Sequence, residues 1–68
     1  MNIPNPIAKR GSRVLVRNYR KRPPVWEEGE LIGLAYENQF GSFRWHYTVR
    51  LDRGVQLYMG VDGIRAIQ

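Results

Sequence analysis

A strict alternation over residues 43–51 constrains the fold of this chain more than any other feature. Aromatic and aliphatic side chains occupy every second position from Phe43 to Leu51, and Arg, His and Thr occupy the positions between them. Because successive side chains of a β-strand point to opposite faces, this pattern predicts a strand with one apolar and one polar face. The chain is therefore expected to build a β-sheet around this strand.

A second strand is predicted to return beside it as a hairpin. The turn is Asp52-Arg53-Gly54, where glycine is free to adopt a positive φ. The strand that follows, residues 55–59, alternates again, with Val55, Leu57 and Met59 on the apolar side. Gln56 and Tyr58 are then expected on the opposite face.

Shorter segments complete the predicted sheet. Alternation and turn residues place strands at 13–19, 30–36 and 64–67, and Gly33 is expected to allow a bend in the second of these. The loop over 20–28 contains Pro23 and Pro24, which exclude both a helix and a central strand.

Residues 60–63 are too few for an ordinary helix and are expected to form one helical turn before the last strand. The predicted fold class is therefore all-β: a small five-stranded SH3-like barrel with a single helical turn before the last strand.

Chain length limits what such a domain can do alone. The 68 residues form one domain, expected as a flexible arm over 1–10, which contains Pro4 and Pro6, followed by the barrel over 11–68. A domain of this size buries only about 60% of its unfolded surface. There is no cysteine, and His46, the single histidine and an expected surface residue, cannot build a metal site. Oligomerisation is the remaining source of stability.

The charge indicates phosphate-bearing partners. Eleven Lys and Arg residues against six Asp and Glu residues give a formal net charge of +5. A positive net charge of this size attracts nucleic acid or a phosphorylated cofactor, and charge alone does not distinguish between these two partners. The longest apolar run, residues 31–36, is far shorter than the roughly 20 residues of a membrane span. The protein is expected in the cytoplasm, with no membrane partner.

The tetrapeptide Val55-Gln56-Leu57-Tyr58 is the most specific motif in the chain. It resembles the Val-Gln-Ile-Tyr motif of the plasmid-borne type II dihydrofolate reductases, the family that confers trimethoprim resistance. Trp26 and the segment Leu31-Ile32-Gly33 are similar to that family's second strand, and the spacing of apolar residues over 61–67 is similar to its closing segment. The resemblance extends from Gly11 to the end of the chain.

The resemblance implies a homotetramer that reduces dihydrofolate with NADPH in a central pore and is insensitive to trimethoprim. By the same resemblance, Gln56, Leu57 and Tyr58 are the catalytic and cofactor-binding residues, with the Leu57 backbone meeting the nicotinamide carboxamide. The family's ligand-binding lysine corresponds to Val16 or Arg17 when counted from Gly11, and to Arg20 or Lys21 when counted from Trp26. Arg17 and Lys21 are therefore the candidate cations, and Trp26 is a candidate interface residue.

Two other functions remain open. A barrel of this size also binds nucleic acid through basic side chains and stacking aromatic rings. The candidate phosphate contacts are Arg13, Arg17, Arg20, Lys21, Arg22 and Arg44, and the candidate stacking residues are Tyr19, Phe40 and Trp45. A third hypothesis is a module that binds other proteins.

Overall fold

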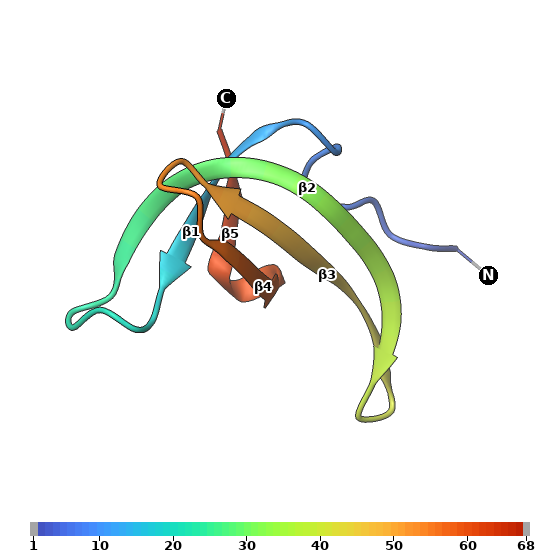
Figure 1. The fold of residues 1–68 in the computed structure, drawn as a ribbon. Helices are drawn as coiled ribbons and strands as arrows, with labels where there is room; N and C mark the ends of the chain where they lie inside the picture. Colours follow the sequence, from blue (N-terminus) through green and yellow to red (C-terminus); the bar gives the residue numbers. More distant parts are fainter. Residues whose placement is uncertain (1, 68) are drawn as a thin grey trace.

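The protein folds as one antiparallel sheet of five strands. The structure, a computed structural model, describes residues 2–67. Its elements are β1 (Arg13–Asn18), β2 (Val25–Gln39), β3 (Ser42–Leu51), β4 (Gln56–Gly60), the 3₁₀ turn η1 (Val61–Gly63) and β5 (Ile64–Ala66). The strand order across the sheet is β4-β3-β2-β1-β5 (Figure 1). The predicted all-β class, with five strands and one helical turn before the last, is confirmed.

The sheet does not close into a barrel, so that part of the prediction is wrong. Within residues 2–67, β4 pairs only with β3, and β5 pairs only with β1. Strand β5 has only three residues, all paired with β1, so it offers few backbone groups for a further pairing with β4. Strong curvature of β2 nevertheless wraps the sheet around its concave face (Figure 1).

Strand β2 is longer than predicted. It starts at Val25, inside the segment 20–28 that was expected to be a loop, because Val25 to Glu30 pair residue by residue with β1. The two prolines therefore end the loop and do not interrupt the strand. The pairing with β3 shifts between Leu31 and Gly33, so the bend expected near Gly33 is confirmed.

Both hairpins of the sheet have tight turns. Between β3 and β4, Gly54 has a φ of +95°, as the sequence predicts. Between β2 and β3, Phe40 and Gly41 form a two-residue loop with φ values of +54° and +84°. Two successive positive φ values are the signature of a type I′ turn, for which Asn-Gly is the favoured pair. Phe40 is 98% exposed, so its side chain gains no packing in return.

We expect Phe40→Asn to raise the free energy of unfolding by about 1 kcal/mol, because asparagine tolerates a positive φ better than phenylalanine does. Urea unfolding followed by tryptophan fluorescence measures the effect. Phe43→Asn is the control: Phe43 stacks on Tyr36 with ring centroids 5.6 Å apart, so that variant should lose stability. Equal effects of the two substitutions would contradict the assigned turn geometry.

The core lies on the concave face of the sheet. It consists of Val14, Val16, Leu31, Tyr47, Val49, Leu51 and Ile64, each at most 3% exposed. The alternation that predicted β3 is confirmed from Tyr47 to Leu51, whereas Phe43 is 55% exposed because the hairpin extends beyond the core. His46 lies on the opposite face, as expected, but it is only 6% exposed, so its predicted surface position is wrong.

The segment before β1 lies against β3. The Ile7 N–H donates to the Tyr47 hydroxyl (2.9 Å), and the Trp45 Nε1–H donates to the Pro4 carbonyl (2.6 Å). Ala8 packs against the core. These contacts attach residues 2–10 to the sheet, while the flexibility expected of them stays a prediction.

Asn18 anchors the loop between β1 and β2. Its side chain is buried, donates from Nδ2 to Glu27 Oε2 (2.7 Å) and accepts from the Arg20 N–H at Oδ1 (3.0 Å). Glu27 in turn forms an ion pair with Arg53 (3.0 Å). This connected group holds the start of the loop, and with it Arg20, in a defined place.

The pKa of Glu27 predicts how this anchor responds to acid. Hydrogen bonds from Arg53 and from Asn18 lower that pKa below its usual 4.5. A carboxyl whose pKa is lower in the folded state adds stability above its unfolded pKa, and this stability is lost as the pH falls through the folded pKa. We therefore expect Glu27→Gln to be less stable than the parent at pH 7, with a difference that shrinks as the pH falls below 4.5. Urea unfolding across this range tests the prediction, and a difference independent of pH would contradict it.

Candidate ligand site

The tetrapeptide lies on an edge strand with its polar side chains exposed. Leu57 packs against the core from β4, together with Val55 and Met59. Gln56 and Tyr58 therefore point away from the core, and Tyr58 is 63% exposed. The alternation predicted for this strand is confirmed.

A groove runs along this edge, and we call it the tetrapeptide groove. It has a volume of about 340 Å³ and is lined by Arg17, Asn18, Tyr19, Arg20, Gln56, Leu57, Tyr58 and Met59. One wall is β4 and the other is the end of β1 with the first residues of the following loop. The groove thus occupies the place where the sheet does not close, and it brings the tetrapeptide together with Arg17, one of the two predicted cations.

The groove carries uncompensated positive charge. Within residues 2–67, neither Arg17 nor Arg20 forms an ion pair with a carboxylate, whereas Arg13, Arg50 and Arg53 all do. The Arg17 guanidinium lies 5.4 Å from the centroid of the Tyr19 ring, which leaves its charge in place. An anion that enters the groove would contact two guanidinium groups, and the residues that line the groove include no Asp or Glu.

Backbone groups at the β4 edge add hydrogen-bonding capacity. The Leu51 N–H donates to the Val55 carbonyl (2.7 Å), and the pairs of an antiparallel ladder alternate in bonding from there. Leu57, opposite Val49, therefore directs its N–H and C=O toward β3. The free groups at the edge belong to Gln56 and Tyr58, not to Leu57 as the resemblance implies.

Tyr58 is held in place from two sides. Its hydroxyl donates to Glu37 Oε1 (2.7 Å), and its ring stacks on that of His46 with centroids 5.5 Å apart and planes inclined by 15°. The hydrogen bond to Glu37 raises the pKa of the Tyr58 phenol, so this group stays protonated at neutral pH. His46 Nδ1 is buried 3.7 Å from Glu37 Oε1 and has no hydrogen-bond partner within residues 2–67. The result is a fixed phenol with one ring face still exposed.

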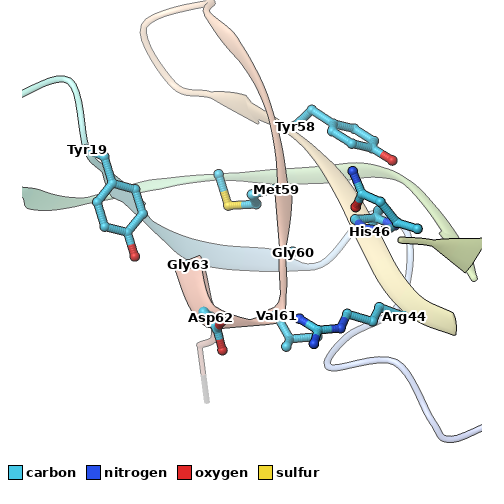
Figure 2. A pocket seen from close by; sticks show the side chains of 10 residues that line it. Tyr19, Arg44, His46, Tyr58, Met59, Gly60, Val61, Asp62 and Gly63 are labelled. Atoms are coloured by element: carbon cyan, nitrogen blue, oxygen red, sulfur yellow. The ribbon is translucent and has the colours of Figure 1, made fainter. Parts of the chain in front are cut away.

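A second groove adjoins the first, and Tyr19, Tyr58 and Met59 contribute to both. This tyrosine groove has a volume of about 360 Å³ and contains Arg44 and Asp62 besides His46 (Figure 2). Figure 2 shows Tyr19 and Tyr58 on opposite sides of Met59, with Arg44 near Val61. Exposed aromatic rings therefore flank the β4 edge.

The other predicted residues lie elsewhere. Lys21 and Arg22 are exposed on the β1–β2 loop and do not line the tetrapeptide groove. Arg13 binds both Glu28 and Asp52, at 2.8 and 2.6 Å, so its guanidinium is already paired. Trp26 is half-buried beneath the Arg65 guanidinium, 4.2 Å from the ring centroid. Of the two candidate cations, only Arg17 lies beside the tetrapeptide.

Sequence reasoning missed Asn18, Glu37 and the buried position of His46. Asn18 resembles any residue at the end of a strand, and Glu37 becomes relevant only because β2 and β3 place it beside Tyr58. No local signal marks either residue. Their roles depend on pairing between distant strands.

Comparisons with known proteins found no relative of the chain. No family model, no curated protein and no solved structure matches the chain. Among residues 2–67 there is no helix with the length and apolar character needed to cross a membrane.

Proposed function

We propose that the protein is a homotetrameric, trimethoprim-insensitive reductase of the type II dihydrofolate reductase kind, with NADPH and dihydrofolate bound at the tetrapeptide groove. The observation that carries the proposal is the meeting of Arg17 and Arg20 with the exposed side chains of Gln56 and Tyr58 in one groove. A cytoplasmic location belongs to the same proposal.

The residues of the groove fit such ligands chemically. NADPH and dihydrofolate both combine planar rings with anionic groups. Unpaired guanidinium groups bind phosphate and carboxylate through charge-assisted hydrogen bonds. The Gln56 amide both donates and accepts, and the Tyr58 ring offers an exposed aromatic face. Each ligand therefore finds both a cation and a partner for its rings.

The size of the groove supports an oligomer. Small-molecule sites have volumes of about 300–1,000 Å³ and enclose most of the ligand. A groove of about 340 Å³ at the lower end of this range does not enclose two ligands side by side. Several chains that place their β4 edges around one axis would combine their grooves into a larger site.

The chain's own part in the reaction is orientation. The reduced nicotinamide supplies the hydride when it is bound, so the protein needs mainly to hold two rings in register. Gln56 is assigned to hydrogen bonds with the ring substituents, Tyr58 to ring contact, and Arg17 with Arg20 to the anionic groups. The hydrogen bond from Tyr58 to Glu37 reduces the freedom of the phenol before any ligand arrives.

The experiment is a spectrophotometric assay combined with a mass measurement. The purified chain is mixed with NADPH and dihydrofolate, with and without trimethoprim, and light scattering gives its oligomeric state at the same concentration. The proposal expects oxidation of NADPH that depends on dihydrofolate, is unaffected by trimethoprim and accompanies a tetramer. The proposal would be refuted if the protein showed no turnover and no tetramer that binds NADPH.

Arg17→Ala is expected to raise the KM for NADPH about tenfold, the loss of one charge-assisted hydrogen bond of roughly 1.4 kcal/mol. Arg22→Ala is the matched control, because Arg22 is exposed on the adjoining loop but does not line the groove. Steady-state kinetics on both variants give the comparison. Equal effects would place the cofactor's anionic groups outside the tetrapeptide groove.

A second candidate function is binding of single-stranded nucleic acid. Tyr19 and Tyr58 are 59% and 63% exposed beside Arg17 and Arg20, which form no ion pair within residues 2–67. In such an arrangement bases stack and phosphates are neutralised. Trp45, another predicted stacking residue, is partly buried and hydrogen bonded to Pro4. Titration of a fluorescent oligonucleotide at two salt concentrations tests this function, which expects steep salt dependence and similar losses for Arg17→Ala and Arg22→Ala.

A further inference from the structure

The N-terminal segment docks into a groove of its own. We call residues 2–10 the arm, and the surface against which it lies, the arm groove, is formed by Tyr36, Phe43, Arg44, Trp45, Tyr47 and Val61. Pro4, Asn5 and Ile7 of the docked arm line a remaining cavity of about 330 Å³ together with these residues. It lies on the distal half of the β2–β3 hairpin, apart from the tetrapeptide groove. Tyr36 stacks on Phe43 and lies 5.4 Å from Trp45, centroid to centroid, so an aromatic cluster forms its floor.

The groove recognises the arm through backbone groups. Trp45 Nε1–H donates to the Pro4 carbonyl, and the Tyr47 hydroxyl accepts from the Ile7 N–H three residues later. Between these two bonds lie Asn5 and Pro6. An aromatic floor with a tryptophan donor suits an extended, proline-containing segment, because such a segment has little conformational freedom to lose and keeps its carbonyl groups free.

Few contacts hold the arm on its own chain. Within residues 2–67, its attachments are the two hydrogen bonds to Trp45 and Tyr47, a local bond from the Ser12 N–H to the Lys9 carbonyl (3.1 Å), and partial packing of Ala8 against the core. Ile3 and Ile7 remain 58% and 38% exposed while the arm is docked. The arm joins β1 through a turn in which Gly11 has a φ of +91°. The Gly11 N–H donates to the Leu31 carbonyl (2.7 Å), so the chain is held on β2 from Gly11 onward and only the arm before it is able to take another path.

We propose that the arm is exchanged between copies of this chain, so that the arm of one molecule occupies the arm groove of another. The occupant is defined by the structure itself, since the arm already seated in the groove is present in every copy. Exchange of an identical element is a low-cost route to association, because each contact of the closed molecule is made again in the dimer. This proposal stands independently of the reductase proposal.

The side chains left exposed favour the exchanged form. Ile3, Ile7, Phe43 and Val61 all remain at least 38% exposed around the docked arm. They form an apolar surface that a second chain arriving with its arm would cover. The absence of cysteine makes the chain suitable for a direct test of this contact.

The test uses two full-length single-cysteine variants. Asn5→Cys carries its thiol on the arm and Arg44→Cys carries it on the groove wall. The two proteins are mixed and treated with a short bis-maleimide, and mass spectrometry identifies the covalent products. Exchange predicts a cross-linked pair made of one molecule of each variant, with a yield that rises with protein concentration.

Three comparisons make the result decisive. Arg53→Cys replaces the groove thiol with one on the β3–β4 turn, away from the arm (Figure 1), and should give little product with Asn5→Cys. Adding Trp45→Phe to the Arg44→Cys chain removes the donor to Pro4 and should lower the yield about fivefold, the effect of one ordinary hydrogen bond. Adding Trp26→Phe instead, which alters the tryptophan outside the arm groove, should leave the yield unchanged.

Two results would overturn the proposal. The first is no mixed product at any concentration, including the case where a chain carrying both Asn5→Cys and Arg44→Cys links only within itself. The second is an equal yield with Arg53→Cys, which would show random collision. Neither result bears on NADPH oxidation, so this proposal and the reductase proposal fail separately.

Discussion

Gln56→Ala is expected to lower the kcat for NADPH-dependent reduction of dihydrofolate about 100-fold, in line with the loss of a single oriented hydrogen-bonding group that acts in the transition state. The side chain is exposed in the tetrapeptide groove. Within residues 2–67 its amide makes no hydrogen bond to the protein. Its removal therefore breaks no contact that holds the fold.

The matched control is Gln39→Ala. Gln39 is also exposed, but it lines the tyrosine groove and not the tetrapeptide groove. Stopped-flow and steady-state measurements on both variants, together with thermal unfolding, separate catalysis from stability. If Gln56→Ala had the parental kcat, Gln56 would have no role in the reaction. The tetrapeptide would then be an ordinary edge strand with polar side chains facing solvent.

Gly29→Ala is expected to destabilise the protein by about 3 kcal/mol or more, at the upper end of the cost of overpacking. A Cβ at this position would lie 2.6 Å from the Arg50 carbonyl oxygen and 2.9 Å from Val49 Cγ1. The carbonyl belongs to the backbone of β3 and cannot move without disturbing the central ladder. Small domains have total stabilities of about 0.05–0.15 kcal/mol per residue, so this loss removes much of the stability available to 68 residues.

Gly60→Ala provides the comparison. A Cβ at Gly60 meets nothing within 4 Å, and the backbone there has a φ of −89°, which any residue adopts. We expect its stability to stay within about 0.5 kcal/mol of the parent, since alanine also reduces the freedom of the unfolded chain. Urea unfolding of the two variants measures the difference. A Gly29→Ala protein as stable as Gly60→Ala would contradict the close approach of β2 to β3.

The glycines of β2 show which structural constraints the local sequence pattern predicts and which it does not. The sequence singles out Gly33 as the special glycine of β2, and the ladder does shift there, but a Cβ at Gly33 would find its nearest neighbour at an ordinary 3.6 Å. Gly29 carries the tighter constraint. The predicted loop over 20–28 and the predicted strand over 30–36 leave Gly29 between them, because the partner that approaches it belongs to a strand about twenty residues away.

In the candidate site, too, some features follow from local sequence pattern and others only from the tertiary structure. Alternation along residues 55–59 predicts that Gln56 and Tyr58 share the exposed face, and the structure places both there. Counting from two landmarks left Val16, Arg17, Arg20 and Lys21 open as the position equivalent to the family's ligand-binding lysine. Burial of Val16 and the position of Lys21 on the outer loop leave Arg17 and Arg20 beside the tetrapeptide.

The sequence by itself determined the elements whose signals are local: the alternation of β3 and β4, the turn at Gly54, the single helical turn and the all-β class. These follow from the two-residue period of a strand and from the freedom of glycine, which act within a few residues. The tertiary structure alone decided that β2 begins at Val25, that the sheet stays open, that His46 is buried and that Arg17 and Gln56 line one groove. Those outcomes depend on which strands pair and how far the sheet curves, and both are set by contacts between residues far apart in the chain.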